Sequence, residues 1–193
     1  MSSGTHPLPP ELDPVLSFVN SVDIELDTDE WAAGPPALAG WLTLNGLLND
    51  GDVRVTSAEF GLARDLRAGL RAMTLANNGV PAEPAVLDDL RAALRAFPLT
   101  VRPDAAGGGA LTGTVEGPVM AALGVVVAGY ATGLLTGAWA RMRQCPAGDC
   151  AWVFWDSSAR SARRWCKMRV CGNRAKVRAF AERQRAAEIA GPG

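Results

Sequence analysis

The 193-residue chain contains only one histidine and one tyrosine. The histidine, His6, lies in a proline-rich segment near the N-terminus, far along the chain from every other candidate functional residue. The chain therefore has no imidazole base near a nucleophile, and it also lacks a glycine-rich phosphate-binding motif. We find no catalytic constellation and predict that the protein is not an enzyme.

Cysteine is also scarce, and all four cysteines lie within residues 145–171. Each pair has four residues between its members, and fifteen residues separate the two pairs. Two cysteine pairs on short loops, joined by one spacer, supply the four sulfur ligands of a tetrahedral zinc site. Such a site has no open coordination position, so its role is structural. We predict one structural Zn²⁺ per chain, bound by Cys145, Cys150, Cys166 and Cys171.

Disulfides are the first alternative, and a redox or iron–sulfur role is the second. The N-terminal segment MSSGTHPLPPELDP has neither the basic start nor the apolar run of a secretory signal. We therefore expect a cytoplasmic protein, in which thiols stay reduced and clustered cysteine pairs favour metal over disulfide.

Long apolar runs are nearly absent. The one stretch that approaches membrane-spanning length, residues 115–140, is interrupted by five glycines and a proline. We interpret it as a buried helix and expect no association with a membrane.

The pattern of apolar residues predicts a mainly α fold. Helical spacing indicates five helices before the cysteines, over about residues 14–22, 36–48, 57–76, 84–97 and 118–142. Thr56 and Glu59 form a capping-box signature for the third helix, and residues 99–102 and 110–115 read as a β-hairpin around a glycine-rich loop. We predict three parts: a disordered tail (1–12), a helical domain with a small β-hairpin (13–142), and a Cys₄ treble-clef-like zinc module ending in a basic helix (143–193).

Charge is distributed unevenly between these parts. Residues 141–193 carry twelve basic and four acidic residues, a net of +8, whereas residues 1–140 carry seven basic and sixteen acidic residues, a net of −9. The positive charge favours contact with the phosphates of double-stranded DNA. It could also offset the negative charge of a zinc–tetrathiolate centre, or dock protein or RNA. The candidate DNA-binding residues are Arg163, Arg164, Lys167, Arg169, Arg174, Lys176 and Arg178.

The helical domain offers weaker signals. Asn20, Asp23 and Trp41 could line a pocket for a small-molecule effector, or act only as caps and core residues. We expect Arg64, Arg67 and Arg71 to lie on a solvated helix face. The aromatic residues of the zinc module are expected to form its small core rather than to stack on bases.

Several motifs carry a family resemblance. They are Phe18-Val-Asn-Ser, Cys145-x₄-Cys150, Phe154-x-Asp156-x-Ser158, Arg164-Trp-Cys166 and Cys171-Gly-Asn-Arg174-x-Lys176. In these motifs the chain resembles the bacterial CGNR zinc-finger proteins, whose N-terminal helical region is called the ABATE domain. The resemblance implies zinc binding by the four cysteines and a role as a candidate stress-induced transcription regulator. The expected partners are DNA, an effector and a second copy of the chain, and the alternative is a non-enzymatic protein- or RNA-interaction module on a helical scaffold.

Overall fold

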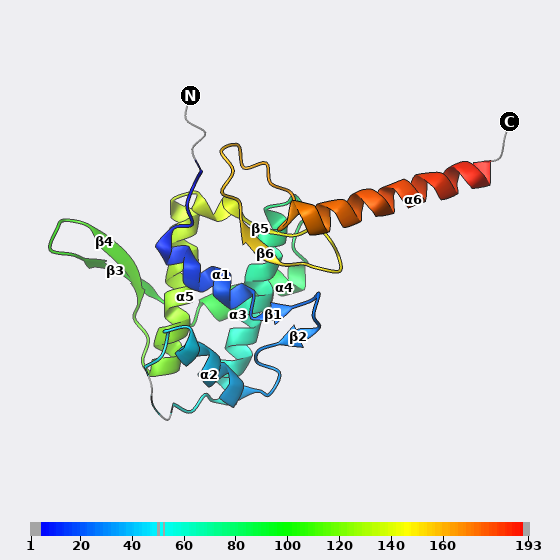
Figure 1. Cartoon of the computed structure of the whole chain (residues 1–193). Coiled ribbons are helices and arrows are strands. Elements are labelled where there is room, and N and C mark those ends of the chain that lie inside the picture. Colours follow the sequence, from blue (N-terminus) through cyan, green and yellow to red (C-terminus); the bar gives the residue numbers. More distant parts are fainter. Residues whose placement is uncertain (1–4, 50, 52, 191–193) are drawn as a thin grey trace.

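The computed structural model describes residues 5–49, 51 and 53–190, which form a helical body with a small module at one end (Figure 1). The mainly α prediction is confirmed. The helices of the described residues are α1 (Asp13–Val19), α2 (Pro35–Leu44), α3 (Ser57–Ala76), α4 (Pro84–Leu94), α5 (Pro118–Leu135) and α6 (Asn173–Ala190). Two 3₁₀ turns, η1 (Pro10–Leu12) and η2 (Ala138–Arg141), and one π-helical turn, η3 (Met168–Gly172), complete the helical elements.

Strands occur only as short antiparallel pairs in the described residues. β1 (Val22–Asp23) pairs with β2 (Thr28–Asp29), and β3 (Leu99–Pro103) pairs with β4 (Gly109–Gly113) as the predicted hairpin. β5 (Met142–Gln144) pairs with β6 (Val153–Trp155) at the base of the zinc module.

Local sequence signals explain where the helices begin. The α3 capping box is present, because Glu59 N–H donates to Thr56 Oγ1 at 3.2 Å and Thr56 N–H donates to Glu59 Oε2 at 2.8 Å. Prolines occupy the first turns of α1, α2, α4 and α5, where a missing N–H costs nothing.

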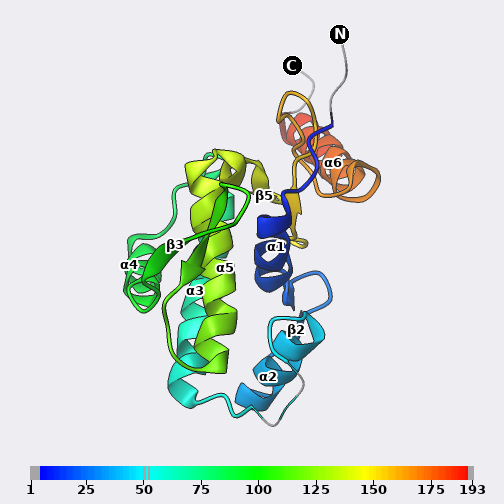
Figure 2. The same cartoon turned by 90° about the vertical axis from the view of Figure 1, so that its left-hand side faces the viewer.

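The core of the body lies between α1, α3 and α5, with α4 packed on the outer side of α3 (Figure 2). Phe18, Trp31 and Trp41 form an aromatic cluster with ring centroids 5.2–5.9 Å apart. This cluster joins α1 to α2 and to the loop after β2.

α5 is the one helix of the described residues that is long and apolar enough to cross a membrane by length and composition. Ten of its residues are buried in the body, where it packs against η1, α1 and β4. Its apolar composition is therefore explained by its place in the core, as predicted.

Two boundaries differ from the predictions. α5 ends at Leu135 rather than near residue 142, because Gly137 adopts a left-handed conformation (φ 75°) that stops the helix. The chain then turns through η2 into β5. Residues 5–12 also do not behave as a disordered tail: Leu12 is fully buried, and His6 N–H donates to Ser157 O at 3.0 Å. Residues 1–4 of the predicted tail lie outside the described residues.

The prediction of a solvated arginine face on α3 is wrong for Arg67. This side chain is buried, stacks over Trp31 at 3.9 Å and forms a two-point ion pair with Asp29 at 2.6 and 2.8 Å. The Arg67 guanidinium holds the pKa of the Asp29 carboxyl below its usual range. Arg67 thus pins the β1–β2 hairpin to α3.

Candidate metal centre and basic surface

The first cysteine pair lies on the turn between β5 and β6. Cys145 N–H donates to Trp152 O at 2.8 Å, and Cys150 N–H donates to Ala147 O at 2.9 Å. Ala151 takes a positive φ of 50° as the chain leaves the turn. The strand pair therefore fixes the direction of both side chains.

The second pair is delivered from the start of the last helix. Cys166 precedes η3, and Cys171 lies within it, with its N–H donating to Lys167 O at 2.9 Å. α6 follows directly. The predicted treble-clef-like module has this arrangement, with one ligand pair on the turn of a strand pair and the second at the N-terminus of a helix.

The four sulfurs fit one zinc ion. All four Sγ atoms lie within 4.8 Å of one another, and the Cys150–Cys166 and Cys166–Cys171 pairs are 3.5 Å apart. A tetrahedron with Zn–S bonds of about 2.3 Å places its sulfurs roughly 3.8 Å apart, whereas a disulfide requires about 2.05 Å. All four cysteines are free and buried. The cluster is a structural zinc site, and its geometry does not support the disulfide alternative.

Burial makes the thiols reluctant to ionise without a cation. It raises the pKa of Cys150 to about 11 and, together with the neighbouring thiols, also raises the pKa of Cys166. Burial acts in the same direction on Cys171, but hydrogen bonds from Arg174 and the other thiols outweigh it and lower that pKa. Zn²⁺ would supply the charge that holds all four groups as thiolates.

A buried carboxylate shapes the loop between the two pairs. The fully buried Asp156 accepts hydrogen bonds from Ser158 N–H (2.9 Å), Ser158 Oγ (2.6 Å) and Arg163 N–H (2.9 Å). Burial alone would raise its pKa, but these bonds lower it. Asp156 therefore organises the loop that carries the chain back to Cys166.

The aromatic residues of the module have structural roles. Phe154 is buried within the cysteine cluster, and Trp165 packs against it. Trp155 Nε1–H donates to His6 O at 2.8 Å, which ties the N-terminal segment to the module. Trp152 is the most exposed of the four, at 38%.

Several side chains of the body hold the module. The buried Asn20 donates from Nδ2 to Val153 O at 2.8 Å and accepts from Val153 N–H at 2.9 Å. Arg71 bridges Val19 O (2.6 Å) and Ala151 O (2.9 Å). Arg71 was predicted to lie on a solvated face of α3, but these two bonds place it between the body and the module. Burial lowers the pKa of its guanidinium. The module is thus fixed on the body by side-chain bonds to its backbone.

The predicted basic residues divide into two groups. In the first, the cation already has a partner: Arg163 bonds to Trp165 O and Cys166 O, and Arg174 pairs with Glu25 at 2.9 Å and Asp149 at 3.4 Å. Arg178 also pairs with Asp149, at 3.3 Å. These three side chains are held within the molecule.

The second group is exposed and forms no ion pair within the described residues. Arg164 rests over the Trp165 ring at 5.1 Å, and the others are exposed at the N-cap of η3, on η3 and on α6. Sequence reasoning had not singled out Arg183, which is also exposed on α6. We call this second group the free basic face: Arg164, Lys167, Arg169, Lys176 and Arg183.

The predicted effector residues do not share one cavity. Asn20 and Trp41 line a pocket of about 310 Å³, but the Asn20 amide is occupied by Val153. Asp23 lies at a different pocket of about 360 Å³, beside Cys150 and Lys167. Its carboxylate caps the β1–β2 turn by accepting Glu25 N–H at 2.9 Å.

The comparisons with known proteins agree with this architecture. Residues 12–138 match the sequence model of the ABATE family, described as "Putative stress-induced transcription regulator". The chain belongs to the ABATE family. Residues 141–184 match the model of the CGNR zinc finger. No curated protein matches the chain.

The sequence had not revealed the acidic partners of the basic residues. Glu25 lies far from α6 in the sequence and meets Arg174 only after the β1–β2 hairpin folds against the module, whereas Asp149 meets Arg174 through the folding of the module itself. The available signal was the run of acidic residues between 23 and 30, opposite in charge to the tip.

Proposed function

We propose that this ABATE-family protein is a zinc-dependent, DNA-binding transcription regulator. One observation carries the proposal: the free basic face begins between the zinc ligands Cys166 and Cys171 and continues along α6, a helix that projects from the acidic body (Figure 1). Arg164 lies just before Cys166. Zinc binding fixes the start of this helix, so the metal would order the surface that meets DNA.

The geometry of α6 suits contact with phosphates. Lys176 and Arg183 are seven residues apart, so their side chains leave the same face of the helix. Lys167, the N-cap of η3, and Arg169 on η3 precede this face. Because the body carries the opposite charge, a DNA duplex would be attracted to the tip and repelled by the rest.

The charge-reversed variant Lys176→Glu with Arg183→Glu tests the proposal. Each lost phosphate contact lowers the log–log salt slope of duplex binding by about one, so we expect a decrease of roughly two. Arg91→Glu with Arg95→Glu on and just after α4 makes the same charge change away from the tip and should retain more of the affinity. If both variants lost the same amount of DNA affinity, the DNA-binding site would not lie on α6.

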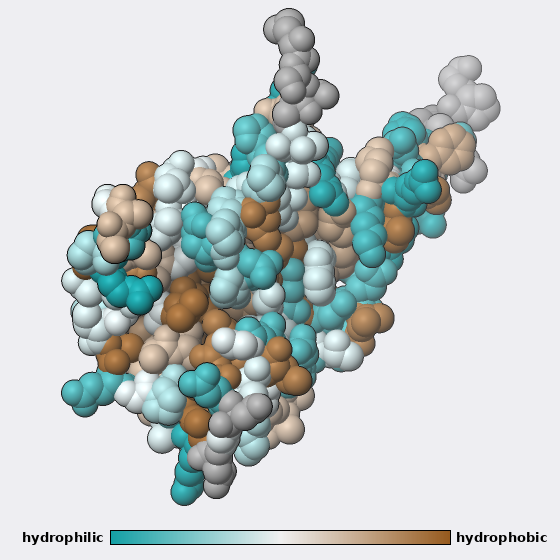
Figure 3. Space-filling view, turned by 60° about the vertical axis from the view of Figure 1, so that its left-hand side comes forward, coloured by the Kyte–Doolittle hydropathy of each residue, from teal (hydrophilic) through white to brown (hydrophobic). Residues whose placement is uncertain are grey.

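A second candidate function is docking of a protein partner. Val177 and Phe180 on α6 are 68% and 56% exposed, and Val170 on η3 is 43% exposed. Figure 3 shows α6 standing clear of the body with hydrophobic atoms among the hydrophilic ones. Phosphate binding does not require these apolar groups. If Val177→Ser with Phe180→Ser abolishes regulation while duplex binding persists, α6 serves both purposes.

Effector sensing and homodimer formation remain part of the proposal. Sensing is assigned to the helical body as a whole, because Asn20, Asp23 and Trp41 do not surround a common cavity. Chromatography with light scattering at two protein concentrations, with and without duplex DNA, tests the dimer.

A further inference from the structure

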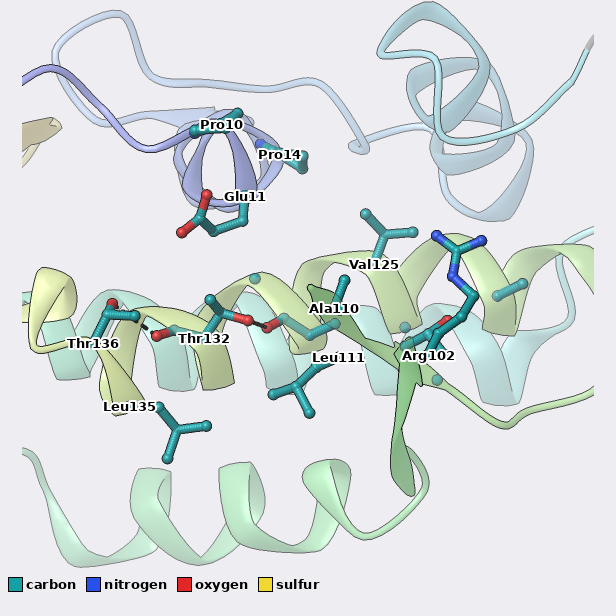
Figure 4. Close-up of a pocket in the computed structure, with 17 residues that line it drawn as sticks. Pro10, Glu11, Pro14, Arg102, Ala110, Leu111, Val125, Thr132, Leu135 and Thr136 are labelled. Atoms are coloured by element: carbon teal, nitrogen blue, oxygen red, sulfur yellow. Dashed lines mark hydrogen bonds between the residues drawn. The ribbon is translucent and has the colours of Figure 1, made fainter. Parts of the chain in front are cut away.

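A large pocket lies on the outer face of α5. It measures about 780 Å³ and is bounded by three separate segments: η1 with the start of α1, strand β4 with Arg102 of β3, and α5 itself (Figure 4). This volume falls within the range of about 300–1,000 Å³ that is typical of ligand pockets.

Two close backbone contacts hold the walls of this groove in place. At Gly129 an added Cβ would lie 2.2 Å from Glu11 O, so α5 touches η1 directly. At Gly124 the helix approaches Gly113 of β4, where an added Cβ on Gly113 would lie 3.5 Å from the Gly124 Cα. The groove is the space left between these contacts, and its width is therefore set by backbone rather than by movable side chains.

The open edge of β4 forms one wall. All five consecutive residues of β4 line the groove, whereas Arg102 is the only lining residue from β3. Side chains alternate between the two faces of a strand, so lining by five residues in succession means that the groove runs along the strand edge. Within the described residues β4 pairs only with β3. An unpaired edge is a template for another extended chain.

The remaining surfaces are mainly apolar, with Thr132 and Thr136 at one end of α5 and one charge on each outer wall. Both threonine hydroxyls donate to backbone carbonyls of α5. Val125, on the α5 side, is 46% exposed although it belongs to the core helix. Glu11 reaches in from η1 and Arg102 from the hairpin, and neither forms an ion pair within the described residues. The groove thus combines an apolar floor, a hydrogen-bonding edge and two opposite charges.

We propose that this groove binds a short extended peptide segment as a third strand beside β4. Main-chain hydrogen bonds to the β4 edge would supply affinity, as in other strand-addition complexes. One peptide face would lie on α5, and a basic and an acidic side chain would meet Glu11 and Arg102. Five residues at about 3.4 Å each span the length of β4. A third strand would also support a hairpin that is only marginally stable with two.

The test uses the zinc-loaded full chain and an array of blocked pentapeptides with one basic and one acidic end around varied apolar residues. The tightest peptide should perturb the NMR amide signals of β4 and α5. N-methylation of its central amides should weaken binding at least tenfold, because it removes the strand hydrogen bonds. Glu11→Gln and Arg102→Gln should each weaken binding severalfold, and the matched controls Glu116→Gln and Arg95→Gln should not.

Three results would overturn the proposal. One is an array without any binder. Another is a peptide whose affinity is unaffected by N-methylation. The third is concentration-dependent self-association that broadens the β4 signals, which would assign the edge to a second copy of the chain.

Discussion

α5 and α6 are both eighteen residues long, but they are supported in opposite ways. α5 lies in the body with ten buried residues, including Leu123 at 0% exposure. α6 packs against η3 and forms ion pairs with Glu25 and Asp149 near its start, and it then projects into solvent, with every side chain described on it exposed or half-buried (Figure 1).

The difference shows that helix length does not determine what stabilises a helix. Apolar burial stabilises α5 at roughly 25 cal/mol per Å². Most helical stability in proteins comes from tertiary packing, which α6 has only near its N-terminal end, so its stability depends on that end. There the zinc ligand Cys171 and the Arg174–Glu25 and Arg178–Asp149 pairs fix the chain.

Removal of zinc should have the largest effect. Structural zinc binding in small modules is worth about 10–16 kcal/mol, so chelation or Cys166→Ser should unfold residues from about 143 onward and leave the body folded. Hydrogen exchange followed by mass spectrometry should show α6 losing protection while α3 and α5 keep it. If α5 and α6 lost protection from exchange together, the body and the module would unfold as one unit.

Truncating one apolar side chain on α5 and one on α6 should lower the free energy of unfolding by different amounts. Leu123→Ala creates a cavity in the core and should lower the free energy of unfolding by about 2–5 kcal/mol. Phe180→Ala removes an exposed ring and should change it by less than about 0.5 kcal/mol. Urea titrations monitored by far-UV circular dichroism provide both values. A large decrease in the free energy of unfolding for Phe180→Ala would show that another surface covers Phe180 in solution.

Asn20 joins the two halves, so its loss should weaken the junction. Asn20→Ala leaves the buried N–H and C=O of Val153 without partners, and an unsatisfied buried group costs about 1–3 kcal/mol. Asn45→Ala, whose amide bonds only to Trp41 O on its own helix, is the matched control. A fluorescent zinc chelator should extract the metal faster from Asn20→Ala than from the control. Equal extraction rates would argue against the junction.

Neutralising the acidic hairpin should produce the smallest change. Glu25→Gln removes the closer of the two acidic partners of Arg174, at the edge of the basic tip, and leaves Asp149. Because exposed ion pairs are worth about 0–1 kcal/mol, duplex DNA binding should tighten by up to about fivefold. Asp89→Asn on α4 removes a similar charge far from the tip and serves as the control. An unchanged affinity in Glu25→Gln would show that the hairpin does not compete with DNA.

The sequence predicted most of the local structure and the metal ligands. Cysteine spacing specified the zinc site, because ligand number and loop length follow directly from sequence. Apolar periodicity and the Thr56–Glu59 capping box located α3, and the basic helix predicted at the end of the zinc module is α6.

Features that depend on distant contacts could not be predicted. Arg67 looked like a solvated residue on α3, but its partners Asp29 and Trp31 belong to a hairpin that only the folded chain brings near. Asn20 was a candidate ligand-binding residue, but its bonds are to a strand 133 residues away. The end of α5 was missed because Gly137 is one of five glycines in this apolar stretch, and the sequence does not show which of them adopts the left-handed conformation that stops the helix.

The most direct test of the account is a salt titration of duplex DNA binding with zinc-loaded protein. Contacts from four members of the free basic face, Lys167, Arg169, Lys176 and Arg183, would give a log–log slope of about −3.6. Zinc-stripped protein should bind at least tenfold more weakly, because these cations would no longer be held on one ordered surface. A zinc-loaded protein that fails to bind DNA at low salt, or binds equally well without zinc, would contradict the account.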